Sequence, residues 1–179
     1  MSQKAETFLI DANALITPFQ KYYPFNWAPL FWQCMKDAIL SGDVLLLDVV
    51  KKEILKGQKE DEKKDALTEW IEMFGDGVVL NSQNNEILNM YKEVLEYVKT
   101  CGLYQSSALM EWANDDVADP WIIASACTGG HIIITFESSS SSLNKKSPSK
   151  KAKIPDVSKH FSVECKDLFY MMRSLDFKL

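Results

Sequence analysis

Five acidic side chains follow or adjoin the apolar segments of this chain, where strands and helices would bring them together. Ligands of an open α/β sheet bind at the carboxyl ends of its strands, so acids at these positions are candidate site residues. Carboxylates that share a pocket repel one another, and the usual resolution is a cation. Oxygen ligands without Cys or His select hard ions such as Mg²⁺ or Mn²⁺, which activate water and offset phosphoryl charge. The five acids are Asp11, Glu53, Asp116, Asp119 and Glu137.

Two of these acids follow apolar runs that have the length and composition of strands. Asp11 comes directly after the run at 7–10, with Asn13 two residues later, and Glu137 comes two residues after the run at 131–135. If the two strands are neighbours in a parallel sheet, their carboxyl ends bring both acids to the same edge. A structural interpretation is also open, because Asp11 and Asn13 suit an Asx-turn and Glu137 suits an ordinary loop.

The other candidate acids lie in or beside expected helices. Glu53 is three residues from Val50, which places it along the apolar edge of its helix. Asp119 opens a further helix, with Asp116 one turn earlier. The structural alternatives are a solvated charge for Glu53 and, for Asp119, an N-cap followed by Pro120 at the first helical position. An N-cap aspartate can still turn one oxygen outward, so the two interpretations of Asp119 are compatible.

Short β-rich runs alternate with helical segments, which predicts βαβ crossovers and an α/β fold with a parallel sheet covered on both faces. The expected strands are 7–10, 44–47, 77–80, 131–135 and 161–165. The expected helices are 27–41, 49–56, 60–74, 84–100, 104–113, 118–128 and 166–175. Asp48 is the expected N-cap of the second helix, and Gly102 is expected just after the end of the fourth.

Length and composition fit a single domain over residues 1–179, with 46% hydrophobic and 25% charged residues. No apolar run reaches the roughly 20 residues of a membrane helix, and the start of the chain lacks a signal-peptide core. We therefore expect a cytoplasmic protein with no membrane partner. The cysteines lack zinc-site spacing, so we expect unpaired and mostly buried thiols. They are Cys34, Cys101, Cys127 and Cys165.

The charge balance restricts how this chain could recognise a nucleic acid. A net charge of −5 argues against a surface-wide nucleic-acid platform, and the 20 basic residues include only one arginine, Arg173. Phosphate contacts would therefore come from lysines and backbone amides. A Ser/Lys-rich stretch at about 137–153 is expected to be a flexible surface loop, which either guides a phosphate backbone or is merely solvated. Its candidate RNA-binding residues are Lys145, Lys146, Lys150, Lys151 and Lys153.

Four motifs occur in an order that resembles a known family. They are FLIDAN, VLLLDVVKKEI, ADPWIIASA and HIIITFE, and on them the chain resembles the PIN-domain nucleases. The stretches QKYYPFNWAPLFW, LLLDVVKKEI with the following KG, VADPWIIASA and KIPDV are similar to a stand-alone bacterial PIN branch related to VapC-type toxins. The likeness extends over roughly residues 7 to 170. The ordered set of motifs is more specific than its opening D-x-N alone.

The resemblance implies a PIN-like three-layer sandwich whose central parallel sheet has the strand order 3-2-1-4-5. It also implies hydrolysis of RNA phosphodiester bonds with Mg²⁺ or Mn²⁺ as cofactor, and an antitoxin protein as partner if the chain is a toxin. Asn13 and Thr135 would position the metal-binding acids without binding the metal themselves. The catalytic and metal-holding acids carried over by position are Asp11, Glu53, Asp119 and Glu137.

The chain departs from the PIN pattern at the fourth motif. The family's motif usually ends in an aspartate, whereas the sequence here reads Thr135, Phe136 and Glu137. Asp116 or Asp156 could therefore take the place of Glu137 as the fourth acid, and the occupancy of a second metal site is open.

Two other functions remain open on the sequence. A HAD-type phosphatase also places an aspartate after its first strand, but it normally needs D-x-D, and position 13 is Asn. A PIN-like module with an impaired acid set could instead bind RNA or a protein without catalysis. The aromatic stretch Tyr22–Trp32 could belong to a homodimer or partner surface, although we expect most of its rings to pack in the core.

Overall fold

The sheet at the centre of this protein is parallel throughout. The computed structural model describes residues 6–57 and 64–179. Within them, β1 (Phe8–Ile10), β2 (Val44–Leu45), β3 (Ile132–Ile134) and β4 (Cys165–Lys166) pair in the order β2-β1-β3-β4. The prediction of an α/β fold with a parallel sheet is confirmed, and the strands at 7–10 and 131–135 are neighbours as expected.

The expected third strand at 77–80 does not form, so the prediction of five strands is wrong. Val78 and Val79 both donate their backbone N–H to Gly75 O in a turn, which leaves only Leu80 to pair with the sheet. Leu80 forms a single parallel bridge with Leu47 beside β2. This bridge lies where an edge strand would lie, but the turn makes it too short to be one.

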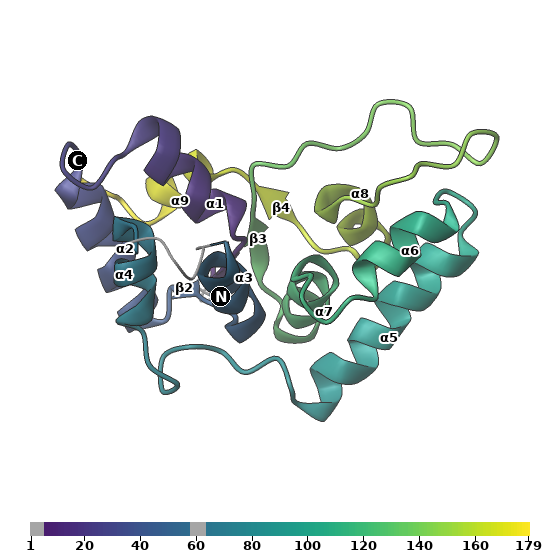
Figure 1. Ribbon diagram of the computed structural model, residues 1–179, viewed down its shortest axis with the longest axis horizontal. Coiled ribbons are helices and arrows are strands. Elements are labelled where there is room, and N and C mark those ends of the chain that lie inside the picture. Colours follow the sequence, from purple (N-terminus) through teal and green to yellow (C-terminus); the bar gives the residue numbers. More distant parts are fainter. Residues whose placement is uncertain (1–5, 58–63) are drawn as a thin grey trace, which may run out of the picture.

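Helices cover both sides of the sheet (Figure 1). In Figure 1, α2, α4 and α9 lie to the left of the sheet, and α5, α6, α7 and α8 lie to its right. The helices α1 and α8 and the two short turns η1 and η2 were not expected from the sequence. Residues 60–63 of the expected helix 60–74 lie outside the described residues. The bounds are α1 Asn13–Thr17, π-helical η1 Pro18–Tyr22, α2 Pro29–Ser41, α3 Asp48–Lys56, α4 Ala66–Glu72, α5 Asn85–Thr100, α6 Ser106–Trp112, α7 Asp119–Gly129, α8 Ile154–Ser158, 3₁₀-helical η2 Lys159–Phe161 and α9 Leu168–Ser174.

Two expected N-caps are in fact the first residues of their helices. The N-cap of α3 is Leu47, and Asp48 follows it and uses Oδ1 to accept from the N–H groups of Val49 and Ser82. Asp119 likewise begins α7 without capping it. Each aspartate lies one residue inside its helix, so neither occupies the N-cap position. Gly102, in contrast, follows α5 with a φ of 76°, as a residue just past a helix end should.

One continuous core fixes the elements that carry the candidate acids. All three residues of β1 are fully buried, and α7 is buried along most of its length from Pro120 to Ala126. Both elements are therefore rigidly placed against their neighbours. The described residues contain no helix long and apolar enough to span a bilayer.

The aromatic stretch Tyr22–Trp32 and the cysteines agree only in part with the predictions from the sequence. Trp32 stacks on Phe25 and contacts Phe31 edge-on, in agreement with core packing, but Trp27 is 82% exposed. The four cysteines are free, as expected, but each is half-buried rather than fully buried.

Candidate functional site

The first candidate acid sits where β1 and β3 end side by side. Ile10 of β1 pairs with Ile134 of β3, so the next residues, Asp11 and Thr135, face one another across the strand pair. The backbone N–H of Asp11 continues the ladder by donating to Ile134 O at 3.0 Å. Thr135 Oγ1 donates to Asp11 Oδ2 at 2.8 Å. The carboxylate of Asp11 is 4% exposed and is held in one orientation by this bond.

Thr135 and Asn13 form a small network behind Asp11. Besides donating to Asp11, Thr135 Oγ1 accepts from Asn13 Nδ2 at 3.1 Å and from the backbone N–H of Glu137 at 3.0 Å. Asn13 Oδ1 accepts from the backbone N–H of Phe136 at 2.8 Å. The hydroxyl proton and both acceptor positions of Thr135 are thus used, which ties the turn after β1 to the chain after β3.

Glu53 and Asp119 approach from the two helices beside these strands. The backbone N–H of Ala118, the N-cap of α7, faces the Glu53 carboxylate and lowers its pKa, so α3 and the start of α7 lie next to each other. Asp119, the next residue, is close enough to Asp11, Glu53 and Glu137 to feel the charge of each. The four acids that were expected to converge do lie near one another.

Glu137 is anchored where the long loop begins and ends. Its Oε2 accepts from the backbone N–H of Ile154 at 2.8 Å, which closes the segment between them into a loop. Asp156, the alternative fourth acid, instead accepts from the backbone N–H of Ser140 at 3.0 Å. Burial raises the pKa of Glu137, and the Ile154 N–H and the charge of Lys153 oppose this rise only in part.

Burial and mutual repulsion make these acids hard to ionise. Burial, opposed by the Thr135 hydroxyl and aided by Glu137 and Glu53, raises the pKa of Asp11 from an ordinary 3.8 to about 7. Burial and the charges of Asp11, Glu137 and Glu53 raise the pKa of Asp119 from 3.8 to about 8. The pKa of Glu53 is also raised, by burial. Two carboxyls with pKa values near neutral at one sheet edge mark a functional-site candidate.

Asp116 lies outside this cluster. It is exposed and forms ion pairs with Lys52, at 3.0 Å, and with Lys56, both of which lie on α3. These lysines lower its pKa, in the direction opposite to Asp119. Asp116 therefore lies on a solvated face and does not take the place of Glu137 among the buried acids.

The lysine-rich loop is tied to the protein at several points. The backbone N–H of Gln105 donates to Ser149 O at 2.8 Å, and that of Ser149 donates to Leu103 O at 2.8 Å, so the middle of the loop lies beside the start of α6. Lys153, at its end, donates to Ser138 O at 3.0 Å and faces Glu137. The remaining candidate RNA-binding lysines are exposed, and they are Lys145, Lys146, Lys150 and Lys151.

The donor atoms of the site suit a divalent cation, but the described side chains are not already arranged as a set of metal ligands. The site offers only carboxylate oxygens, which suit Mg²⁺ or Mn²⁺. In residues 6–57 and 64–179, however, no three Asp, Glu, His or Cys side chains are grouped closely enough to hold an ion as they stand. Asp11, Glu53 and Glu137 each turn an oxygen toward a hydroxyl or backbone N–H. A cation would therefore have to draw the second oxygens of these acids inward.

Reasoning from the sequence missed several contributors to the site. Glu111 on α6 adds to the repulsion felt by Asp119, and no local pattern distinguishes it from a surface acid. The backbone N–H groups of Ala118 and Ile154 bind Glu53 and Glu137, and backbone donors leave no trace in residue type. Lys153 was one of the five predicted lysines, but only the fold shows that it lies beside Glu137.

A pocket of about 440 Å³ opens beside Glu137. Thr135, Lys166 and Phe169 also line it, so one wall carries the network behind Asp11 and the other is aromatic and basic. Glu137 is the member of the acid cluster that lines this pocket, at the ends of β3 and β4.

Comparison with known proteins identifies the family but supplies no named relative. No curated protein and no solved structure matches the chain significantly. One family model matches residues 8–179, which include every candidate acid. The chain belongs to this family, which is described as Domain of unknown function (DUF4411).

Proposed function

We propose that this protein is a Mg²⁺- or Mn²⁺-dependent ribonuclease that hydrolyses RNA phosphodiester bonds. The observation that carries the proposal is the convergence of Asp11, Glu53, Asp119 and Glu137 at the carboxyl edge of a parallel sheet, where Glu53 and Glu137 add to the raised pKa values of Asp11 and Asp119. None of the four forms an ion pair with a Lys, Arg or His of the described residues. A cluster of buried and half-buried acids without ion-pair partners is unfavourable, and a divalent cation would relieve it.

The four acids would hold the cation, and three neighbouring groups would set their positions. Such a cation supplies activation of water and neutralisation of charge on the phosphoryl group. Thr135 fixes Asp11 through its hydroxyl, and Asn13 fixes the backbone that leads to Glu137. The N–H of Ala118 fixes Glu53. Preorganised ligands of this kind avoid reorganisation when substrate arrives.

Three features favour a nucleic acid as the substrate. The pocket beside Glu137 is open, and Lys166 borders it. Lys153 stands next to Glu137, where it would meet a phosphate. With a single arginine in the chain, phosphate contact by lysine is favoured over bidentate reading of base edges. The resemblance to VapC-type toxins extends the proposal to an antitoxin protein as a partner.

The test is cleavage of a mixed pool of structured RNA by the full chain with Mn²⁺, with Mg²⁺ and with EDTA. We expect cleavage with either ion, none with EDTA, and none with Asp11→Asn. Far-ultraviolet circular dichroism of the variant should match wild type, because Asn is isosteric with Asp and retains an acceptor for Thr135. Equal cleavage by a folded Asp11→Asn variant would overturn the assignment.

A second candidate is a PIN-like module that binds RNA or protein without cleaving. It is favoured by the ungrouped state of the carboxylates in the described residues and by Glu137 in place of aspartate. Titration with Mn²⁺ separates the two functions, because an impaired pocket should bind the ion poorly. The phosphatase hypothesis gains no support, since the Asn13 side chain is bonded to Thr135 and Phe136.

A further inference from the structure

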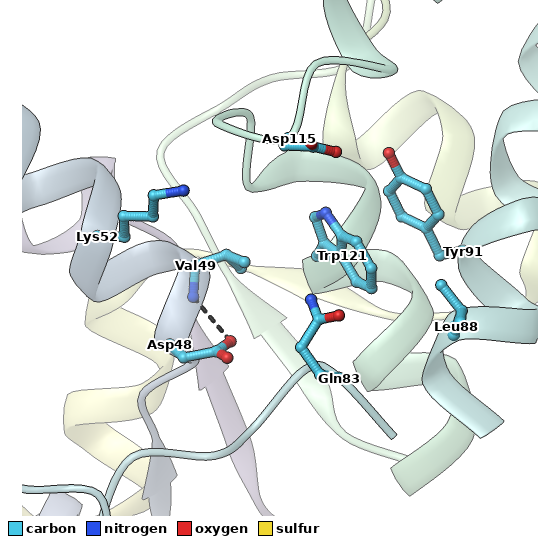
Figure 2. A pocket seen from close by; sticks show the side chains of 8 residues that line it. All are labelled: Asp48, Val49, Lys52, Gln83, Leu88, Tyr91, Asp115 and Trp121. Carbon is cyan, nitrogen blue, oxygen red and sulfur yellow. Dashed lines mark hydrogen bonds between the residues drawn. The ribbon is translucent and has the colours of Figure 1, made fainter. Parts of the chain in front are cut away.

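A second pocket, of about 490 Å³, lies between α3, α5 and α7 (Figure 2). Helix α3 contributes Val49 and Lys52, α5 contributes Leu88 and Tyr91, and α7 contributes Trp121. Three polar side chains complete its lining, namely Asp48, Gln83 and Asp115. The pocket thus combines an aromatic and aliphatic wall with a few polar groups, which is the usual composition of a small-molecule site.

One polar group in this pocket has no partner in the described part of the chain. Trp121 is 5% exposed, and its indole Nε1 makes no hydrogen bond with residues 6–57 or 64–179. An indole N–H can only donate, and a buried donor without an acceptor costs free energy. Figure 2 shows the indole nitrogen on the side of the ring that faces Asp115. A ligand that places an acceptor there would satisfy this donor.

The acids of the pocket differ in what they are free to bind. Asp48 is committed, because its Oδ1 accepts from the N–H groups of Val49 and Ser82. Asp115 has no hydrogen bond or ion pair with a described residue. Lys52 does not neutralise it, since that ammonium pairs with Asp116 at 3.0 Å. Asp115 is exposed and lines the same pocket as Trp121, so its carboxylate is an acceptor available to the N–H donors of a ligand.

The aromatic wall accepts a flat ligand. Trp121 stacks on Tyr91 with ring centroids 3.9 Å apart, and this pair holds the indole in a fixed orientation. Val49 and Leu88 supply apolar surface on either side (Figure 2). A planar ring suits the aromatic wall of Trp121 and Tyr91. One edge of that ring would need an acceptor for Trp121 Nε1 beside two donors for the Asp115 carboxylate.

Among the four RNA bases, only guanine presents that edge. Its O6 acceptor lies next to N1–H and N2–H, and the two donors match the two oxygens of one carboxylate. Adenine and cytosine offer one amino donor beside an acceptor, and uracil offers one N–H between two acceptors. Unpaired bases are commonly recognised on this edge by hydrogen bonds together with aromatic side chains.

We propose that this pocket binds a guanine base, with Asp115 accepting from N1–H and N2–H and Trp121 donating to O6. The proposal rests on the proposed function for its role, which is to select a guanosine next to the bond that is cut. Helix α3 carries both Lys52 of the pocket and Glu53 of the acid cluster as consecutive residues. Asp119 likewise precedes Trp121 by two residues on α7. The proposed role therefore requires the phosphate of a bound nucleotide to extend from the pocket past α3 to the acids.

The experiment is calorimetric titration of the full chain, in EDTA, with GMP, IMP, AMP, CMP and UMP. We expect GMP to bind at least about tenfold more tightly than AMP, CMP or UMP, because only guanine offers two N–H donors to the Asp115 carboxylate beside an acceptor for Trp121. IMP, which lacks the N2 amino group, should fall between GMP and AMP. Equal binding of GMP and AMP, or no binding of GMP, would overturn the proposal.

Variants separate this pocket from the acid cluster. Asp115→Asn should weaken GMP at least about tenfold, and Trp121→Phe, which keeps a ring, should also weaken it. The matched control is Asp37→Asn, an exposed aspartate on α2, which should bind GMP as wild type does. Full GMP affinity in Asp115→Asn would contradict the assignment. Asp11→Asn should lose cleavage but keep GMP binding, so failure of the nuclease and failure of the guanine site give different results.

Discussion

Asp116 and Asp119 are three residues apart, yet the fold gives them opposite electrostatic surroundings. Asp119, at the start of α7, is largely enclosed with three other acids, and its pKa is raised to about 8. Asp116 lies in the preceding loop, pairs with Lys52 and Lys56, and has a lowered pKa. An aspartate is thus hard to ionise at position 119, where burial and other acids surround it, and easy to ionise at position 116, where two lysines pair with it.

The difference shows that burial and neighbours, not residue type, decide which acid can do chemistry. Lys52 and Lys56 of α3 point to the solvated side, where they neutralise Asp116. Glu53 of the same helix points to the buried side and adds negative charge beside Asp119. Helix α3 therefore separates the two regions, with cations on one face and an uncompensated carboxylate on the other.

The largest expected contrast is in catalysis. Asp119→Asn removes one ligand from the buried cluster and should lower RNA cleavage at least about a hundredfold. Asp116→Asn removes an acid that only pairs with lysines, so it should cleave within about twofold of wild type at a fixed salt concentration. Initial rates with Mn²⁺ at pH 7.5 measure both. Equal losses in the two variants would break the contrast between the regions.

The dependence of stability on pH should also distinguish the two acids when no divalent ion is present. Asp119 has a pKa of about 8 in the fold and 3.8 as its ordinary value, so the folded state holds its proton more tightly. The free energy of unfolding should therefore fall as pH rises from about 4 to about 8, by on the order of 1 kcal/mol per pH unit for this group. Urea unfolding between pH 5 and pH 9 in EDTA measures the slope.

Asp119→Asn should make this slope shallower and raise stability at pH 8, because the repulsion is gone. Asp116→Asn should leave the slope unchanged over this range. The pKa of Asp116 is lowered, so its favourable contribution is lost only at more acidic pH. A slope that Asp119→Asn does not alter would show that Asp119 is ionised at no cost.

Cation binding should reverse the penalty in the buried cluster. An ion at about 100 times its Kd stabilises the fold by about 2.7 kcal/mol, which corresponds to a rise in Tm of about 5–10 °C for a chain of this size. Differential scanning fluorimetry with Mn²⁺ should show this rise in wild type and in Asp116→Asn, but not in Asp119→Asn. An equal rise in all three proteins would place the ion elsewhere.

The smallest expected effect concerns the hydroxyl behind Asp11. Thr135→Val removes the hydroxyl that donates to Asp11 Oδ2, and cleavage should fall about tenfold while the fold is kept. Because that hydroxyl lowers the pKa of Asp11, the pH profile of cleavage should shift to higher pH. Thr135→Ser should restore both rate and profile. A rate loss without a shift in the profile would indicate a packing role alone.

Local patterns were sufficient for much of the fold. Hydrophobic runs and their spacing located the four strands and the longer helices to within a few residues. The expected strand at 77–80 does not form, because the backbone N–H groups of Val78 and Val79 bond to Gly75 O in a turn. The apolar composition of 77–80 does not indicate this turn. The short helices α1 and α8 were missed, since five residues carry too little periodicity to be recognised.

The sequence by itself determined which residue types the site contains and where along the chain they occur. Acids placed after strands and at a helix start predicted a common edge, because parallel strands end on the same side of a sheet. The tertiary structure alone decided that Asp119 joins the cluster while Asp116 does not, and that Glu111 and two backbone N–H groups contribute. It also brought Asp115 and Trp121 to one pocket with α3 and α5. Burial and the distance between charges depend on segments far apart in the sequence, so no local pattern contains them.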